Sequence, residues 1–152
     1  MLIKKTLELT QLYFGSSVPS EVACAPSQNK GMVFTDDNGK EYVFAQDGLN
    51  VWRSTFDNWL LQQAKQSGAQ ICDGTFATNV EDMGDCVSVT LKGRKSGTFK
   101  FRYVLDCEGA VGAVKRKLLG KSNRSVYTYQ TFNTGSIDLD HGFFYAYLQP
   151  EL

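Results

Sequence analysis

Short alternating segments in the middle of the chain constrain its fold more than any other feature. Apolar and polar residues alternate there with a period of two, which is typical of strands with one buried face. The alternating residues are Val87, Val89, Leu91, Phe99, Phe101 and Tyr103. The stretches EDMGD and KGRKSG, rich in turn-forming residues, separate the segments. The sequence QICDGTFATNVEDMGDCVSVTLKGRKSGTFKFRYVLDC therefore predicts four strands of an antiparallel meander.

A hairpin is predicted nearer the start of the chain. In MVFTDDNGKEYVFAQ, two aromatic-rich segments flank Asp36-Asp37-Asn38-Gly39, and the Asn-Gly pair suits the positive backbone angles of a tight turn. Before it, LIKKTLELTQLYFG has the apolar spacing of a short helix. The following residues, up to about residue 30, are small, polar and twice interrupted by proline, so we expect a loop there.

A second helix is predicted in RSTFDNWLLQQAKQSGAQ. Phe56, Leu60 and Ala64 fall on one helical face, which would be buried. Ser54 is placed to cap the start of this helix, and Gly68 to end it in a left-handed conformation.

The fold class follows from the sum of these elements. SVYTYQTF and FFYAYLQP add two aromatic strands after the meander. We therefore expect an α+β fold in which about seven mostly antiparallel strands accompany two or three helices. No linker or repeat divides residues 1–152, so a single domain is expected.

Composition excludes several classes of function. Sixteen basic residues balance sixteen acidic ones, so no net field would attract nucleic acid. The apolar runs are far shorter than the roughly 20 residues that cross a bilayer, and the expected compartment is the cytoplasm. Four scattered cysteines without a CxxC pair, together with the single His141, support neither a zinc site nor a nucleophile–base pair. Asp36-Asp37 and Asp138-Asp140 lie in turn-like stretches, so no catalytic or metal-binding residues are predicted.

The stretch YVLDCEGAVGAVKRKLLG is the candidate binding element. It runs from an apolar segment through Glu108-Gly109 into a short basic helix. Such a turn offers backbone N–H groups and a carboxylate, which suit phosphates and polyol hydroxyls, and glycine lets a ligand approach the backbone. The local pattern alone fits a plain turn better, with Lys115, Arg116 and Lys117 as favourable charges at the end of the helix.

Two motifs taken together carry a resemblance. VWRSTFDNWLLQQAKQSGAQ matches a helix start of the type R-x-x-F-D-x-W-L, and YVLDCEGAVGAVKRKL matches an acid-glycine motif of the type G-A-D-G-A-x-S-x-V-R-R. The matching residues are Arg53, Phe56, Asp57, Trp59, Leu60, Gly109, Ala110, Val114 and Arg116. Residues 45–120 thus resemble the middle of the geranylgeranyl reductase and FixC-like branch of the flavin-dependent oxidoreductases with the para-hydroxybenzoate hydroxylase fold.

The resemblance implies a set of FAD contacts. In that family the arginine and the acid-glycine turn lie beside the flavin nucleotide. The expected cofactor-binding residues are Arg53, Glu108, Gly109, Ala110 and Gly112. The chain departs from the family pattern at two of them, since Glu108 replaces the usual aspartate and Gly112 the usual serine.

The dinucleotide-binding motif of such flavoproteins, G-x-G-x-x-G, does not occur in the 152 residues. We therefore expect an excised substrate-binding domain of a longer flavoprotein, with a fringe of its FAD-binding domain at about residues 45–60 and 103–120. Its missing partner in cis would be the rest of the FAD-binding domain. FAD would bind the parent protein, whereas no cofactor is expected on this fragment, which should be colourless and inactive alone.

The resemblance also implies an apolar, isoprenoid-like substrate in the parent, which would reduce carbon-carbon double bonds by flavin hydride and could associate peripherally with membranes. The expected substrate wall is a set of aromatic residues, namely Tyr127, Tyr129, Phe132, Tyr145 and Tyr147. Each could equally pack as an ordinary sheet residue. One alternative is a FixC-like dehydrogenase fragment that passes electrons through flavin to a quinone. Another is a self-contained α+β binding module, with a polar surface over residues 104–116 where an excised fragment would expose apolar side chains.

Overall fold

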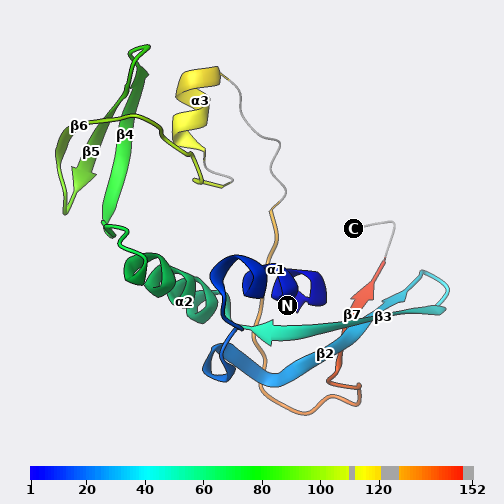
Figure 1. Ribbon diagram of the computed structural model, residues 1–152. Coiled ribbons are helices and arrows are strands. Elements are labelled where there is room, and N and C mark those ends of the chain that lie inside the picture. The colour runs from blue at the N-terminus through cyan, green and yellow to red at the C-terminus, as the bar shows by residue number, and fades with distance from the viewer. Residues whose placement is uncertain (110–111, 121–126, 149–152) are drawn as a thin grey trace. The chain divides into compact units, whose positions relative to one another are not determined.

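The computed structural model describes residues 1–109, 112–120 and 127–148 (Figure 1). Their contacts divide the chain into two compact units, each with its own sheet. The first unit comprises Met1–Ala69 and Gly135–Leu152, and the second comprises Gln70–Thr134. The second unit is therefore inserted into the sequence of the first.

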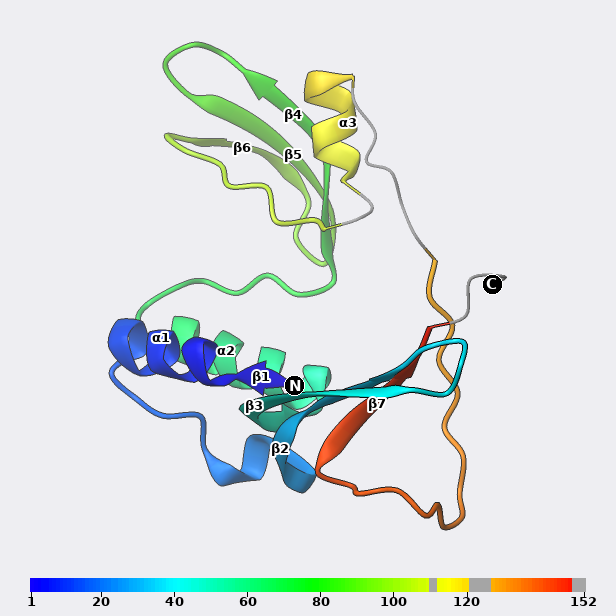
Figure 2. The ribbon, with the colours of Figure 1, turned by 90° about the vertical axis from the view of Figure 1, so that its right-hand side faces the viewer.

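The first unit is built on a four-stranded sheet of order β1-β3-β2-β7. Its elements are β1 (Leu2–Ile3), α1 (Lys4–Phe14), the 3-10 turn η1 (Ser20–Val22), β2 (Ala23–Thr35), β3 (Glu41–Val51), α2 (Arg53–Gln66) and β7 (Phe143–Tyr147). β2 and β3 pair in antiparallel fashion, whereas β7 lies parallel to β2 (Figure 2). One parallel pairing thus joins an otherwise antiparallel sheet.

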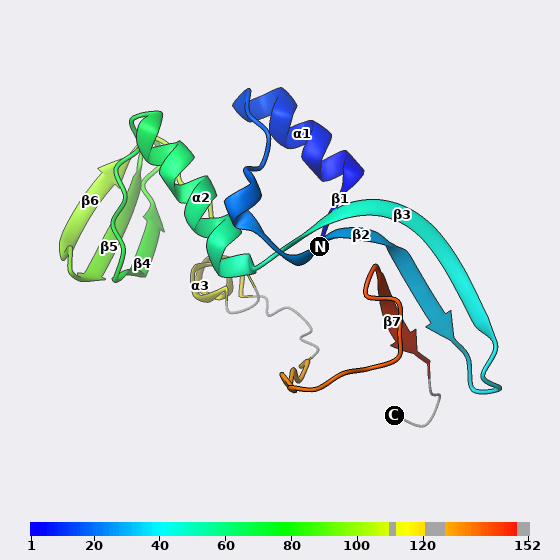
Figure 3. The same ribbon diagram turned by 90° about the horizontal axis from the view of Figure 1, so that it is seen from below.

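The predicted hairpin is confirmed in β2 and β3. Their connection is held by the Asp36 carboxylate, whose Oδ1 accepts hydrogen bonds from the backbone N–H groups of Asn38 and Lys40 at 3.0 and 2.9 Å. Gly39 has the positive φ of 78° that the Asn-Gly pair predicted. Seen from below, the two strands curve together as one ribbon (Figure 3).

The predicted loop up to residue 30 is wrong, because β2 already begins at Ala23. Its first half pairs irregularly with β3, with register shifts between Ala23 and Gln28 and between Asn29 and Gly31. Bulged pairing leaves residues out of the ladder and breaks the alternation of the side chains. The sequence of this part of β2 therefore lacks the period of two that marks a strand.

Both predicted helices of this unit are confirmed. In α2, Phe56 is buried and its ring lies 5.8 Å from that of Trp59, which also meets Phe14 of α1 edge-on. The predicted cap at Ser54 is wrong, since the helix begins at Arg53 and its N-cap is Trp52, two residues before Ser54. Thr55 hydrogen-bonds that end of the helix instead, donating from its hydroxyl to the Trp52 carbonyl at 2.9 Å.

The second unit is a three-stranded antiparallel meander with one helix. Its elements are β4 (Thr75–Asp82), β5 (Val87–Gly93), β6 (Gly97–Phe101) and α3 (Ala113–Leu119). Val114 of α3 is buried with Val80 of β4 and Val89 of β5, which fixes the helix on one face of the sheet (Figure 2). Val87 and Leu91, the other alternating residues of β5, are partly buried against this core, as their spacing predicted.

Two predicted strands are absent from the described residues. The meander has three strands where four were predicted, Tyr103–Leu105 after β6 pairs with no strand, and residues 127–134 follow an irregular path. The count of seven strands is reached because Leu2–Ile3 forms a short strand that the sequence did not indicate. The α+β class is confirmed, with three helices and two sheets. The expected fringes at 45–60 and 103–120 fall in different compact units, and the domain assignment stays a prediction.

Among the helices of the described residues, none is long and apolar enough to span a membrane.

Candidate functional site

The turn at Glu108 is the best-defined part of the candidate site. Its first half is an Asx-type turn, in which the Glu108 N–H donates to Asp106 Oδ1 at 2.9 Å. Gly109 follows with a φ of 69°, and a Cβ built on it would meet nothing within 4 Å. The backbone here is therefore open to close approach by a ligand.

The Glu108 side chain caps helix α3. Its Oε2 accepts a hydrogen bond from the Val114 N–H at 2.8 Å, two residues into the helix from the N-cap Gly112. An N-cap serine would ordinarily satisfy this N–H. Gly112 has no hydroxyl and adopts a left-handed φ of 45°. The two departures from the family pattern are thus coupled, because the longer acid supplies the cap that the glycine lacks.

The charges along α3 match its dipole. The Glu108 carboxylate lies at its N-terminus, and Arg116 and Lys117 lie in its last turn. Lys117 Nζ donates to Asn79 Oδ1 on β4, and together with buried Val114 this holds the helix on the sheet. The carboxylate therefore has a fixed position at the rim of the second unit.

The segment just before the turn exposes apolar side chains. Tyr103 is 75% exposed, Val104 38% and Leu105 90%. The Arg102 guanidinium lies over the Tyr103 ring, 5.3 Å from its centroid. The sequence predicts a strand in this stretch, and among the described residues no strand lies beside it.

Arg53 lies at the start of α2 in the first unit. Its Nε donates to both carboxylate oxygens of Asp57, one helical turn away, at 2.8 and 3.0 Å. The Arg53 side chain is 82% exposed. Arg53 belongs to a different compact unit from Glu108, Gly109 and Gly112, and Ala110 lies outside the described residues.

The predicted aromatic wall is distributed over both units. Tyr127, Tyr129 and Phe132 belong to the second unit and are 95%, 93% and 71% exposed. Tyr145 and Tyr147 lie on β7 of the first unit, on the same face of that strand. Their role in substrate binding stays a prediction.

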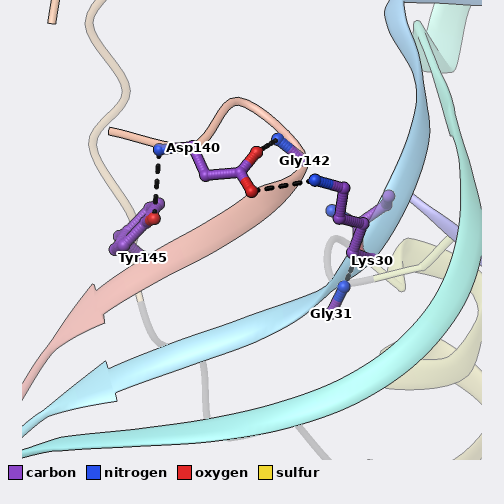
Figure 4. A network of polar contacts seen from close by, with 6 residues as sticks. Lys30, Gly31, Asp140, Gly142 and Tyr145 are labelled. Atoms are coloured by element: carbon purple, nitrogen blue, oxygen red, sulfur yellow. Dashed lines mark hydrogen bonds and ion pairs between the residues drawn. The ribbon is translucent and has the colours of Figure 1, made fainter. Parts of the chain in front are cut away.

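The Tyr145 hydroxyl takes part in a polar network that the sequence did not reveal (Figure 4). It accepts a hydrogen bond from the Asp140 N–H at 3.2 Å. Asp140 in turn accepts from Lys30 Nζ and from the Gly142 N–H, both at 2.8 Å. Lys30 also donates its backbone N–H to the Gly142 carbonyl at 2.6 Å. The network fixes the turn before β7 against β2.

This network perturbs the ionisation of Asp140. The hydrogen bond from Lys30, followed by that from the Gly142 N–H, holds the pKa of the Asp140 carboxyl below its usual range. The sequence indicated only that Asp138-Asp140 lie in a turn. The pairing with Lys30 could not be read from it, because the two residues are 110 positions apart.

Metal-binding side chains do not gather in the part of the chain that the structure describes. No group of three or more histidine, cysteine, aspartate or glutamate residues there could hold a metal ion.

Comparison with known proteins relates the chain to FixC. It is 31% identical over 99 residues to the protein FixC of Shigella flexneri, which covers 64% of this chain and 22% of that protein. FixC of Salmonella typhi is 37% identical over 54 residues, covering 36% of this chain and 13% of the relative, and FixC of Salmonella typhimurium gives the same values. No family model matches the chain. The matches thus span about a fifth or less of the length of these curated relatives.

Proposed function

We propose that residues 1–152 form the substrate-binding part of a flavin-dependent oxidoreductase of the FixC kind, completed by a dinucleotide-binding domain. Two lines of support converge on this proposal. The motifs at Arg53 and Glu108 resemble that group of flavoproteins, and FixC proteins are similar to the chain over up to 64% of its length. The missing G-x-G-x-x-G motif is the part that the other domain would supply.

The exposure of Leu105 carries the proposal. A self-contained binding module would present a polar surface over residues 104–116, yet this leucine is 90% exposed and follows the exposed Val104 and Tyr103. The three residues have strand-forming side chains, and strands of this kind are stabilised by neighbours that pair with them and cover them. A further domain that packs here would bury them.

The turn after this segment fits a flavin nucleotide. Glu108 Oε2 is used by the Val114 N–H, but a carboxylate has about four lone-pair positions, so the same group can accept hydrogen bonds from ligand hydroxyls. Gly109 leaves space for a ligand to approach the backbone. Arg53 would supply guanidinium N–H groups to a phosphate, since Asp57 accepts only from its Nε. When bound, the flavin supplies the redox chemistry, and the protein orients it and excludes water.

The similarity to FixC favours electron transfer through flavin over the reduction of isoprenoid double bonds. The second activity, of the geranylgeranyl reductase kind, has support from the aromatic side chains that lie exposed at Tyr127, Tyr129, Phe132 and Tyr147. An apolar substrate would cover such side chains. In either activity this chain would provide the substrate side of the site and only one rim of the flavin site.

Flavin content tests the proposal. The full-length protein that contains these residues should purify with one flavin per chain, whereas residues 1–152 should bind FAD with a Kd weaker than about 100 μM, because one turn and one arginine offset little of the cost of immobilising the ligand. In the full-length protein, Leu105→Lys should reduce the bound flavin by disrupting the domain contact, and Leu105→Ile should retain it. The absorbance of bound flavin measures the cofactor content of the full-length protein, of residues 1–152 and of the two variants.

Two outcomes would contradict the proposal. One is stoichiometric flavin on residues 1–152 alone, which would show that the site is complete without a second domain. The other is a full-length protein that neither contains nor binds flavin.

A further inference from the structure

The outer edge of β3 is an unpaired strand edge at the hairpin end of the first unit. β1 pairs with β3 only at Gly48 and Leu49, so in the described structure Glu41–Asp47 has β2 on one side and no strand on the other. All seven residues are exposed, including Tyr42 at 43%, Val43 at 62% and Phe44 at 59%. Figure 3 shows this part of β3 on the outside of the curved hairpin.

Between Glu41 and Ala45, this edge has few of the features that usually prevent strands from pairing. Exposed edges are commonly protected by lysine, proline or a bulge. Glu41–Ala45 contains neither lysine nor proline and pairs regularly with β2, and the register shift follows at Gln46 and Asp47. Its row of backbone N–H and C=O groups is therefore available to another strand.

We propose that this edge pairs with the same edge of a second copy of the chain, in antiparallel orientation and centred on Val43. In that register Val43 faces Val43 of the other copy, and Tyr42 faces Phe44 twice. Aromatic pairs directly across neighbouring strands are favourable. Glu41 faces Ala45, so no two like charges lie opposite each other.

The neighbouring registers are less suitable. Centring the pair on Phe44 would place Glu41 opposite Asp47 twice, and like charges directly opposite each other are destabilising. Centring it on Ala45 would place Glu41 opposite Leu49, where β1 already pairs with β3. The charge pattern and the short β1 therefore favour the Val43 register over these two alternatives. The resulting dimer would have one continuous sheet of the order β7-β2-β3-β3-β2-β7.

Sedimentation equilibrium of the 152-residue chain tests this proposal, with hydrogen exchange as a second measurement. We expect a concentration-dependent dimer in which amides of Glu41–Asp47 gain protection as the dimer forms. Val43→Lys would place two lysines opposite each other and should raise the dimer Kd by about tenfold or more. Val43→Thr, which keeps a β-branched side chain, should leave the Kd within about twofold.

Two further variants locate the contact. Phe76→Lys changes an aromatic residue on the sheet of the second unit. Phe76 is 70% exposed, close to the 62% of Val43, and this variant should leave the dimer intact. Glu41→Lys should leave the dimer Kd nearly unchanged in the Val43 register. In a dimer centred on Phe44 it would place lysine opposite Asp47 and lower the Kd, and that result would contradict the Val43 register. Circular dichroism establishes that each variant is folded.

Three results would overturn the dimer itself. A chain that stays monomeric up to about 0.5 mM, well above typical affinities of specific dimers, has no such interface. A dimer insensitive to Val43→Lys, or lost on Phe76→Lys, uses another surface. Protection of Glu41–Asp47 amides in a monomer, independent of concentration, would assign the edge to another segment of the same chain. None of these results depends on flavin binding, so they leave the proposed function untouched.

Discussion

Glu108 shows how a single side chain can take over the role of another position. Its carboxylate reaches the Val114 N–H because glutamate is one methylene longer than the aspartate of the family pattern. Gly112 can then adopt a left-handed backbone without needing a hydroxyl of its own to cap the helix. The effect of a substitution at Glu108 on the stability of α3 should therefore depend on the residue at position 112.

Removing this cap should loosen α3. We expect Glu108→Ala to destabilise the helix start by about 0.5–2 kcal/mol, the usual cost of losing an N-cap. Hydrogen exchange at the Val114 amide should accelerate, while amides in β5 should be nearly unaffected. Asp85→Ala, which removes a carboxylate from the turn between β4 and β5 of the same unit, serves as the control. Unchanged protection at Val114 would contradict the capping role.

Asp140 should make the first unit sensitive to acid. Its pKa in the folded protein is lowered by Lys30 and by the Gly142 N–H, so the ionised form stabilises the fold. This contribution is complete above about pH 4, the ordinary range of aspartate, and is lost as the pH falls through the lowered value. The urea midpoint should fall on acidification.

Asp140→Asn should unfold at a lower urea concentration than the wild type at pH 7. The difference should shrink toward pH 2.5, because the wild-type carboxyl becomes protonated there. Asp138→Asn, in the same turn, should follow the wild type. A difference between Asp140→Asn and wild type that stays constant with pH would rule out the ion pair as its cause.

At the scale of elements, the β2–β3 hairpin depends on close backbone approach at one glycine. Gly31 pairs with Ala45, has a φ of 147°, and a Cβ on it would collide with the Phe44 carbonyl oxygen. Because that obstacle is backbone, the strands would have to separate to accept a side chain. Gly31 also holds the bulged half of β2 in place, since its N–H donates to the buried Asn29 Oδ1 at 2.9 Å.

Gly31→Ala should therefore destabilise the first unit severely, by about 3 kcal/mol or more, because steric strain adds to an unfavourable φ. Urea unfolding followed by the fluorescence of Trp52 and Trp59, both in the first unit, measures the effect. Gly15→Ala makes a suitable control, since Gly15 also has positive φ but has nothing within 4 Å of a built Cβ. Equal losses in the two variants would show that the conformation matters and the close approach does not.

At the scale of the whole molecule, local patterns predicted most elements but not their partners. The Asn-Gly hairpin, the face of Phe56 and the alternation of β5 depend on neighbouring residues, and all were found. Tyr103–Leu105 has a strand-like sequence yet forms no strand, because a strand also requires a neighbour to pair with. The predicted cap at Ser54 lies two residues after the observed N-cap Trp52, which is within the usual uncertainty of helix boundaries.

The candidate site was predictable to a similar extent. The sequence located the Glu108-Gly109 turn, since the acid, the glycine and the helix are adjacent. It could not show that Glu108 caps Val114 in place of a residue at position 112, which requires the path of the turn. The contact between Lys30 and Asp140 was likewise hidden, because the chain forms a whole second unit between them.

The insertion of one unit within the other sets an order of events during translation. β7 pairs with β2, and it is synthesised after the whole second unit. The meander and α3 are synthesised before β7, so they can fold before β7 pairs with β2 in the sheet of the first unit. A nascent chain halted before residue 143 should therefore hold a protease-resistant second unit beside a first unit that is still open to cleavage.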